Sequence, residues 1–246
     1  MKAQPPVGDV TLDRRVADVP GEAVLELSFE VRPRAIRTWI TVARPTGEVE
    51  TRRGRGIELP YDDSSFPRVV CRRGLQLLPD RGRALKEMHR VLTRGGEIEI
   101  AVRGSIERSP PFAELADSLE RHAGVRSAAA VRWLFCMPEP DDLRGVLAAA
   151  AFEEIRVDVV RRTDRSPSLD AFLAHPGAEG GIVPEILKRR VFADLERALG
   201  PCMDQDGLLI TTETIVGRAR RAGRFATRRL GGVGRRRATR SRRRGA

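Results

Sequence analysis

Apolar residues recur along this chain with two different spacings, and these spacings predict its helices and strands. From Arg81 to Leu92 they recur every three or four positions, which predicts an amphipathic helix that ends at Gly95 and Gly96. Helical spacing also covers four later stretches. These are Pro111–His122, Ala128–Phe135, Asp141–Ala150 and Ile182–Leu199.

Short runs in which apolar and polar residues alternate predict the strands. They are Ala23–Leu27, Glu48–Thr51, Arg68–Arg72, Glu97–Arg103, Glu154–Arg162 and Leu208–Arg218. Between the first two runs, Pro33 can begin a short helix that reaches about Val42, and Pro45–Gly47 forms a turn. Strands that alternate with helices favour an α/β fold with an open parallel sheet, and the last two strands would give it an antiparallel edge.

The chain divides into three parts by composition. Residues 1–20 are polar, contain prolines and show no clear period, so we expect a flexible arm. Residues 21–216 carry the periodic segments and form the predicted folded domain, which is long enough to bury a sizeable core. Residues 217–246 contain 13 arginines and no acidic residue, so we expect a disordered Arg-rich tail.

The net charge of +11 comes from this tail. Without it, 32 of the 45 basic residues remain against 34 acidic ones, so the body of the chain is close to neutral. Residues Arg218–Arg244 could hold nucleic acid or an anionic membrane surface by phosphate attraction, with a strong dependence on salt. The alternative is a solvated tail without a ligand.

Cysteine, histidine and apolar runs exclude several classes of protein. The three cysteines and three histidines show no ligand spacing, so we expect no metal site and no disulfide framework. There is no apolar run of membrane-spanning length, about 18 residues, and no secretory signal at the start. These features lead us to expect a cytoplasmic protein.

Two stretches in the middle of the chain resemble the class I S-adenosylmethionine-dependent methyltransferases, in particular the type 11 group that includes ubiquinone and menaquinone C-methylases. LPYDDSSFPRVVC (Leu59–Cys71) is followed at the family spacing by PDRGRALKEMHRVLTRGG (Pro79–Gly96). GEAVLEL at Gly21–Leu27 precedes them, and the resemblance continues to a closing strand near Thr214–Arg218. It implies a Rossmann-like sheet with helices on both faces and an antiparallel last strand.

The resemblance also implies where S-adenosylmethionine would lie, which is across the carboxyl ends of the first strands. The family has a glycine-rich loop after the first strand, an acid that holds the ribose and an aspartate that meets the adenine. The cofactor contacts of this chain would then come from three segments. They are Glu26, Leu27, Ser28, Glu30 and Arg32; Arg55, Gly56 and Ile57; and Arg72 and Gly74.

The chain departs from this pattern at all three contacts. The glycine positions of the loop fall on Ser28, Glu30 and Arg32, whose side chains hinder close approach of the backbone. The adenine aspartate falls on Arg55, which only donates hydrogen bonds. The segment before Leu59 is also too short for the family's ribose acid, helix and next strand, so we expect the sheet to lack an edge strand and its helix.

The acceptor side follows the family more closely. Residues 106–135 resemble the family's lid over small, often lipophilic acceptors. The predicted substrate pocket consists of Arg73, Leu75, Gln76, Phe112, Trp133 and Phe135. Packing in the core is the alternative for the apolar members of this set. No residue stands out as a general base, and methyl transfer depends mainly on in-line positioning.

Three functions remain open on the sequence. The chain could transfer a methyl group from S-adenosylmethionine to a small metabolite, through a remodelled loop at Ser28–Arg34. It could be a catalytically silent partner or regulatory protein of the same fold, with a dimer or protein contact at the exposed sheet edge. It could bind nucleic acid through its tail. A shifted reading frame over Ser28–Arg55 is a further possible origin of the unusual segment.

Overall fold

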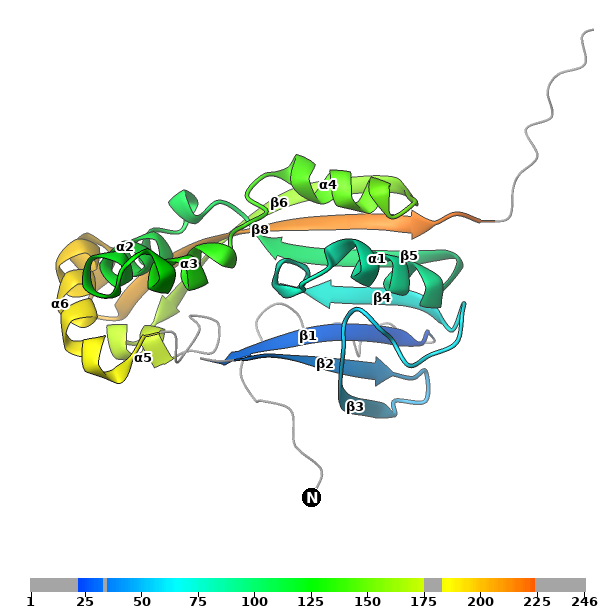
Figure 1. Ribbon diagram of the computed structural model, residues 1–246, viewed down its shortest axis with the longest axis horizontal. Helices are drawn as coiled ribbons and strands as arrows, with labels where there is room; N and C mark the ends of the chain where they lie inside the picture. Colours follow the sequence, from blue (N-terminus) through cyan, green and yellow to red (C-terminus); the bar gives the residue numbers. More distant parts are fainter. Residues whose placement is uncertain (1–21, 33–34, 175–182, 224–246) are drawn as a thin grey trace, which may run out of the picture.

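An eight-stranded mixed sheet runs through the molecule in the order β3-β2-β1-β4-β5-β8-β6, with β7 paired to β8 (Figure 1). The computed structural model describes residues 22–32, 35–174 and 183–223. The strands are β1 (Val24–Arg32), β2 (Ala35–Ala43), β3 (Val49–Gly54), β4 (Phe66–Arg72), β5 (Leu92–Arg103), β6 (Phe152–Ser166), β7 (Met203–Asp204) and β8 (Gly207–Arg221). The α-helices are α1 (Arg81–Val91), α2 (Pro110–Ala123), α3 (Val125–Trp133), α4 (Pro140–Ala149), α5 (Leu169–Ala174) and α6 (Lys188–Leu199).

The centre of the sheet is parallel and its last strands are antiparallel. β1 pairs with β4, and β4 with β5, in parallel register. β8 runs antiparallel between β5 and β6. The predicted α/β fold with an antiparallel last strand is therefore confirmed.

The segment after β1 is a strand, so the helix predicted from Pro33 to Val42 is wrong. β2 returns antiparallel along β1, from Arg32 opposite Ala35 to Val24 opposite Ala43, and β3 pairs with β2 in the same way. Three of four consecutive residues, Ile40, Thr41 and Val42, are β-branched, and such side chains pack well on a pleated sheet. Tertiary pairing thus overrides the helix-start signal of the proline.

The prediction of a missing edge strand is also wrong. β2 pairs with β1 and β3 pairs with β2, both antiparallel, so two strands extend the sheet beyond β1. Between β1 and β4, the described residues contain no α-helix. On this side the sheet therefore ends at β3.

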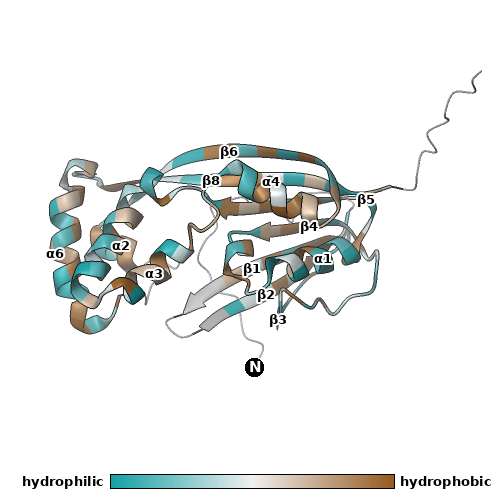
Figure 2. Cartoon of the chain, turned by 45° about the horizontal axis from the view of Figure 1, so that its top comes forward, coloured by the Kyte–Doolittle hydropathy of each residue, from teal (hydrophilic) through white to brown (hydrophobic). Residues whose placement is uncertain are grey.

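A first hydrophobic core lies between one face of the sheet and the helices α1 and α4 (Figure 2). Leu25 and Leu27 of β1 and Ile98 and Ile100 of β5 are buried there, facing the apolar stripe of α1. Burying a side chain of this size contributes about 1.5–3 kcal/mol. The Asp80 carboxylate caps α1 by accepting a hydrogen bond from the Arg83 amide at 2.8 Å.

A second core joins α2, α3, α5 and α6 into a helical lobe at one end of the sheet (Figure 1). Leu208 and Ile210 of β8 pack with this lobe, whereas Ile215 and Ala219 of the same strand pack with α4 and the first core. Because side chains of opposite parity point to opposite faces of a strand, the helices lie on both faces of the sheet, as predicted. No helix of the described ranges is long and apolar enough to cross a membrane.

Two predicted boundaries are wrong. The tail does not begin at residue 217, because β8 continues to Arg221 and its arginines pair across the sheet: Arg218 donates to Glu99 at 2.9 Å and Arg220 contacts Glu97. The rest of the tail and the arm at 1–20 lie outside the described residues. The first helix ends at Val91, and Gly95, with φ of +77°, lies inside β5.

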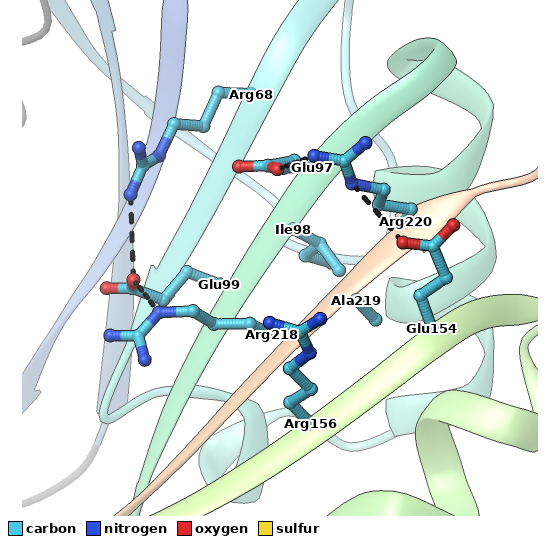
Figure 3. A pocket seen from close by; sticks show the side chains of 9 residues that line it. All are labelled: Arg68, Glu97, Ile98, Glu99, Glu154, Arg156, Arg218, Ala219 and Arg220. Carbon is cyan, nitrogen blue, oxygen red and sulfur yellow. Dashed lines mark hydrogen bonds and ion pairs between the residues drawn. The ribbon is translucent and has the colours of Figure 1, made fainter.

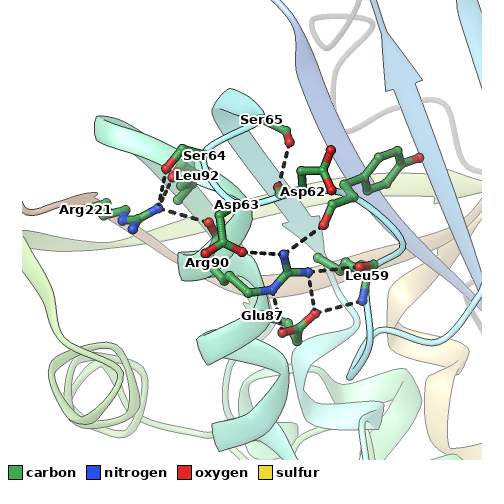
Figure 4. Close-up of polar contacts among 10 residues, drawn as sticks. Leu59, Asp62, Asp63, Ser64, Ser65, Glu87, Arg90, Leu92 and Arg221 are labelled. Atoms are coloured by element: carbon green, nitrogen blue, oxygen red, sulfur yellow. Dashed lines mark hydrogen bonds and ion pairs between the residues drawn. The ribbon is translucent and has the colours of Figure 1, made fainter.

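Arg90 of α1 fixes the loop Leu59–Ser65 that leads into β4 (Figure 4). Its guanidinium donates to both oxygens of the Glu87 carboxylate at 2.9 Å, to Asp63 Oδ1 at 2.8 Å, and to the carbonyls of Tyr61 and Leu59 at 2.8 and 3.0 Å. The hydrogen bond from Arg90 holds the pKa of Glu87 below its ordinary value. The most specific part of the family resemblance is thus the part that anchors this loop.

We expect Arg90→Lys to lower the free energy of unfolding by about 2 kcal/mol, because lysine lacks the planar fork that binds several acceptors at once. Chemical denaturation of the purified variant measures this loss. The control is Arg83→Lys, an exposed position on the same helix, which should change stability by less than about 0.5 kcal/mol. Equal effects of the two substitutions would contradict the anchoring role of Arg90.

Candidate cofactor site

The carboxyl ends of β1 and β4 are the place where an open α/β sheet binds its ligand. In this chain β1 does not end in a loop there. Its predicted glycine-loop positions are paired within the hairpin, with Ser28 opposite Trp39, Glu30 opposite Arg37 and Arg32 opposite Ala35. Backbone that is extended and paired in this way cannot wrap around the amino-acid end of a cofactor.

Phe29 and Gly74 meet at this end of the sheet. A methyl group built on Gly74 would fall inside the Phe29 ring, so the ring lies directly against the glycine backbone. The Phe29 side chain also packs against both hydrophobic cores. Gly74 was predicted to contact the cofactor, but the structure shows an aromatic side chain of the same chain in contact with it.

Glu26 and Arg72 form an ion pair of 3.5 Å between neighbouring strands β1 and β4. Burial raises the pKa of the Glu26 carboxyl, and the positive charge of Arg72 opposes this shift. The Glu26 carboxylate and the Arg72 guanidinium are therefore paired with each other. Leu27, between Glu26 and Ser28, points to the opposite face and is buried in the first core.

The predicted adenine segment packs against the core. Gly56 lies so close to Leu78 that a side-chain carbon at this position would come within 2.9 Å of the Leu78 Cδ2 atom. Ile57 packs on the first core, and Arg55 forms an isolated bridge with Glu58. These contacts give the Arg55–Ile57 turn a structural role.

The direction of β2 removes the ribose contact. Because β2 is antiparallel to β1, its last residue Ala43 lies opposite Val24, the first residue of β1. An acid at the end of this strand would therefore lie at the edge of the sheet remote from Gly74. Together with the hairpin and the Phe29 ring, this arrangement differs from the glycine loop and ribose acid that the resemblance implies.

Three of the six predicted acceptor residues, Leu75, Phe112 and Phe135, belong to the hydrophobic cores. Leu75 and Gln76 follow β4 in a short 3₁₀ turn and are buried, and Gln76 donates to the Leu134 carbonyl at 3.4 Å. Phe112 and Phe135 are buried with their ring centroids 5.4 Å apart. Core packing, the alternative considered for the apolar residues, accounts for Leu75, Phe112 and Phe135.

Two further members of the predicted pocket lie differently. Trp133 is 52% exposed at the end of α3, where the Arg81 guanidinium lies 5.6 Å from its ring centroid. The Arg73 amide donates to the Ala101 carbonyl at 2.6 Å, and its φ of +48° marks the sharp turn after β4. These contacts do not place Trp133 and Arg73 at a common pocket.

Two buried charged residues near the end of β5 were missed by the sequence analysis. Arg103 is buried with its guanidinium carbon 4.7 Å from the Phe112 ring centroid and 5.5 Å from that of Phe135. Glu213 of β8 accepts from Arg108 at 2.7 Å and from Arg161 at 3.1 Å. A polar residue inside a strand gives no local signal that distant arginines will surround it.

The Glu213 ion pairs tie the start of the helical lobe to β8 and β6. Burial raises the pKa of Glu213, but the hydrogen bonds from Arg108 and Arg161 outweigh it, so this pKa lies below its ordinary value. Glu213 is therefore ionised in the folded protein at neutral pH. An ionised carboxylate that already accepts two guanidinium groups is a structural anchor and a poor general base.

A shallow pocket lies on the face of β4, β5, β8 and β6 that does not carry α1 and α4 (Figure 3). Its walls are ion-paired side chains: Arg68 and Arg218 both contact Glu99, and Arg220 contacts Glu97 and Glu154. The lining has four arginines and three glutamates, so these ion pairs balance most of the charge and leave an excess of one positive charge, at Arg156. No group of three or more metal-ligating side chains occurs in the described part of the chain.

We expect Gly74→Ala to lower the free energy of unfolding by about 1–3 kcal/mol, because the added methyl group overlaps the Phe29 ring. The backbone at Gly74 has φ of −131°, which alanine adopts freely, so the cost is steric. In a Phe29→Ala background the same substitution should cost less than about 0.5 kcal/mol. Chemical denaturation of the two single variants and the double variant measures the difference, and additive losses would contradict the contact.

Comparison with known proteins shows which family part of this chain resembles. Residues 23–100 match the model of a methyltransferase domain. A demethylmenaquinone methyltransferase of Staphylococcus epidermidis is 32% identical over 115 residues, which cover 42% of this chain and 47% of that protein. A ubiquinone/menaquinone biosynthesis C-methyltransferase of Geobacter sp. strain M21 is 28% identical over 162 residues, 61% of this chain and 68% of that protein.

The chain spans about half the length of the first of these relatives. Among solved structures, a putative methyltransferase from Bacillus halodurans is 18% identical with a TM-score of 0.45, covering 69% of this chain and 76% of that one. The YcgJ protein of Bacillus subtilis is 14% identical with a TM-score of 0.46, covering 70% of each chain. The sequence match over residues 23–100 and the identity to curated methyltransferases confirm the predicted resemblance to the class I methyltransferase family.

Proposed function

We propose that this chain keeps the framework of a methyltransferase but has reduced or lost methyl transfer, and that it acts by binding a partner. The observation that carries the proposal is the contact of the Phe29 ring with Gly74. It places an aromatic side chain at the end of β1 and β4, where the family's cofactor would lie.

Two further features support this reading. The backbone of Ser28–Arg32 is used in the β1–β2 hairpin, so its pairing would have to break before it could surround a ligand. The only carboxylate of the predicted cofactor contacts whose side chain the structure describes, Glu26, is paired with Arg72. Each of these contacts would be lost on binding the cofactor, and their loss would lower its affinity.

The second candidate is methyl transfer from S-adenosylmethionine to a small, lipophilic acceptor. It is supported by the names of the relatives, which are quinone-pathway methyltransferases, and by the sequence match over residues 23–100. This candidate requires the β1–β2 hairpin to open and Phe29 to leave Gly74. The two candidates thus differ in whether the chain binds the cofactor at all.

Calorimetric titration of S-adenosylhomocysteine into the purified chain at moderate salt separates them. We expect no saturable heat up to about 1 mM ligand, which corresponds to a binding free energy weaker than about −4 kcal/mol. The positive control is the Staphylococcus epidermidis relative titrated under the same conditions. Micromolar binding by this chain would overturn the proposal and establish the second candidate as the one to pursue.

A further inference from the structure

β6 forms one edge of the sheet, and in the described residues it pairs only with β8. It is 15 residues long, and eight consecutive side chains, Asp158–Arg165, are exposed on both of its faces. Val159 and Val160 are among the large apolar residues that remain exposed, at 45% and 38%. A long edge strand offers a row of backbone donors and acceptors to a further strand.

Symmetry restricts how a second copy of this chain could pair with this edge. A two-fold axis that joins two edges into one sheet stands perpendicular to the sheet, so the strands are antiparallel and each residue stays on its own face. In one register, the residue numbers of any two facing residues then add to the same total. This total is even, because facing residues lie on the same face of the sheet. Each possible register therefore centres on one residue that faces itself.

The charges of β6 favour one of these registers. When Val160 faces itself, Asp158 lies opposite Arg162 and Arg156 lies opposite Asp164, so two oppositely charged pairs form and symmetry repeats each of them. All of these residues have even numbers and therefore share one face of the strand. The central pair is apolar, which suits the two partly exposed valine side chains.

The neighbouring registers bring like charges together. Centring the pair on Val159 places Arg156 opposite Arg162, and centring it on Arg161 places Asp158 opposite Asp164. A centre at Asp158 or at Arg162 places a charge opposite its own copy. A centre at Thr163 places Arg161 opposite Arg165. Like charges directly opposite each other destabilise a strand pair, so among centres within the exposed stretch Asp158–Arg165 only Val160 avoids them.

We propose that β6 is a self-association edge, at which two copies of this chain pair antiparallel about Val160 into one continuous sheet. The interaction surface is the stretch Arg156–Arg165, which pairs with β8 in regular register after the irregularity between Glu153 and Arg156. This edge lies at the opposite end of the strand order from β2 and β3, where the sequence analysis expected the contact. The proposal does not depend on whether the chain binds a cofactor.

Sedimentation velocity of the full chain over a range of concentrations tests it with a charge swap. Asp158→Arg or Arg162→Asp alone should weaken dimerisation about tenfold or more, because the two-fold symmetry makes each substitution create two like-charge pairs. The double variant Asp158→Arg/Arg162→Asp restores opposite charges and should dimerise within about threefold of the original chain. Glu196→Arg, an exposed reversal on α6, is the matched control and should leave dimerisation unchanged.

A chain that stays monomeric up to about 100 μM would overturn the proposal, since edge pairing with this charge pattern should exceed that affinity. A dimer that neither reversal weakens, or that the double variant fails to restore, would overturn it as well. Such a dimer would have to form through another surface.

A cysteine test fixes the register independently. With Cys136 and Cys202 replaced by serine, Val160→Cys should form a disulfide-linked dimer under mild oxidation, because residues that face themselves lie about 4.5–5.5 Å apart. Arg165→Cys is the control, since in this register it lies opposite Ile155 and far from its own copy. Equal cross-linking of both variants would contradict the centre at Val160.

Discussion

The direction of β2 is the constraint on which the functional end of this molecule depends. Because β2 returns antiparallel along β1, the segment that the family uses as a glycine loop becomes paired strand. Phe29 continues the alternation of Leu25 and Leu27 and therefore lies on the inward face of β1. Its ring covers Gly74. One change of strand direction therefore removes the loop, the ribose acid and the open glycine surface together.

The rest of the sheet keeps the arrangement of the family because its contacts lie elsewhere. Arg90 holds the loop before β4, and Arg221 of β8 donates to the Arg90 carbonyl at 2.9 Å and to Ser64 at 3.1 Å. These bonds connect the matched segment Leu59–Gly96 to the last strand. The framework is thus stabilised by interactions that do not require the cofactor end, which explains how that end can differ while the fold persists.

Much of this fold could be predicted from the alternation of apolar residues and from the resemblance. The apolar stripe of α1 and the apolar runs of β4, β5 and β8 gave correct elements. The β1–β2 segment could not be predicted, because Pro33 is compatible with a helix start and the strand is settled by its pairing with β1 and β3. The candidate site was predicted from the family's residue positions, which assume a parallel second strand.

The ion pairs of Glu213 and of the β8 arginines could not be predicted from the sequence, for a different reason. Glu213 and its partners Arg108 and Arg161 are far apart along the chain, and no spacing links them. The same holds for the arginines at the end of β8, which looked like the start of a tail because their acidic partners, Glu97 and Glu99, precede them by more than a hundred residues. Composition alone cannot distinguish a paired arginine from a solvated one.

Backbone amide contacts measured by NMR on isotope-labelled protein test the central claim most directly. An antiparallel hairpin predicts cross-strand contacts between the amides of β1 and β2, near Leu27 with Ile40 and Phe29 with Thr38, and slow hydrogen exchange at the paired amides. Helical contacts within Ala35–Val42, without any contact to β1, would contradict it. They would return this end of the molecule to the loop-and-helix arrangement of its relatives.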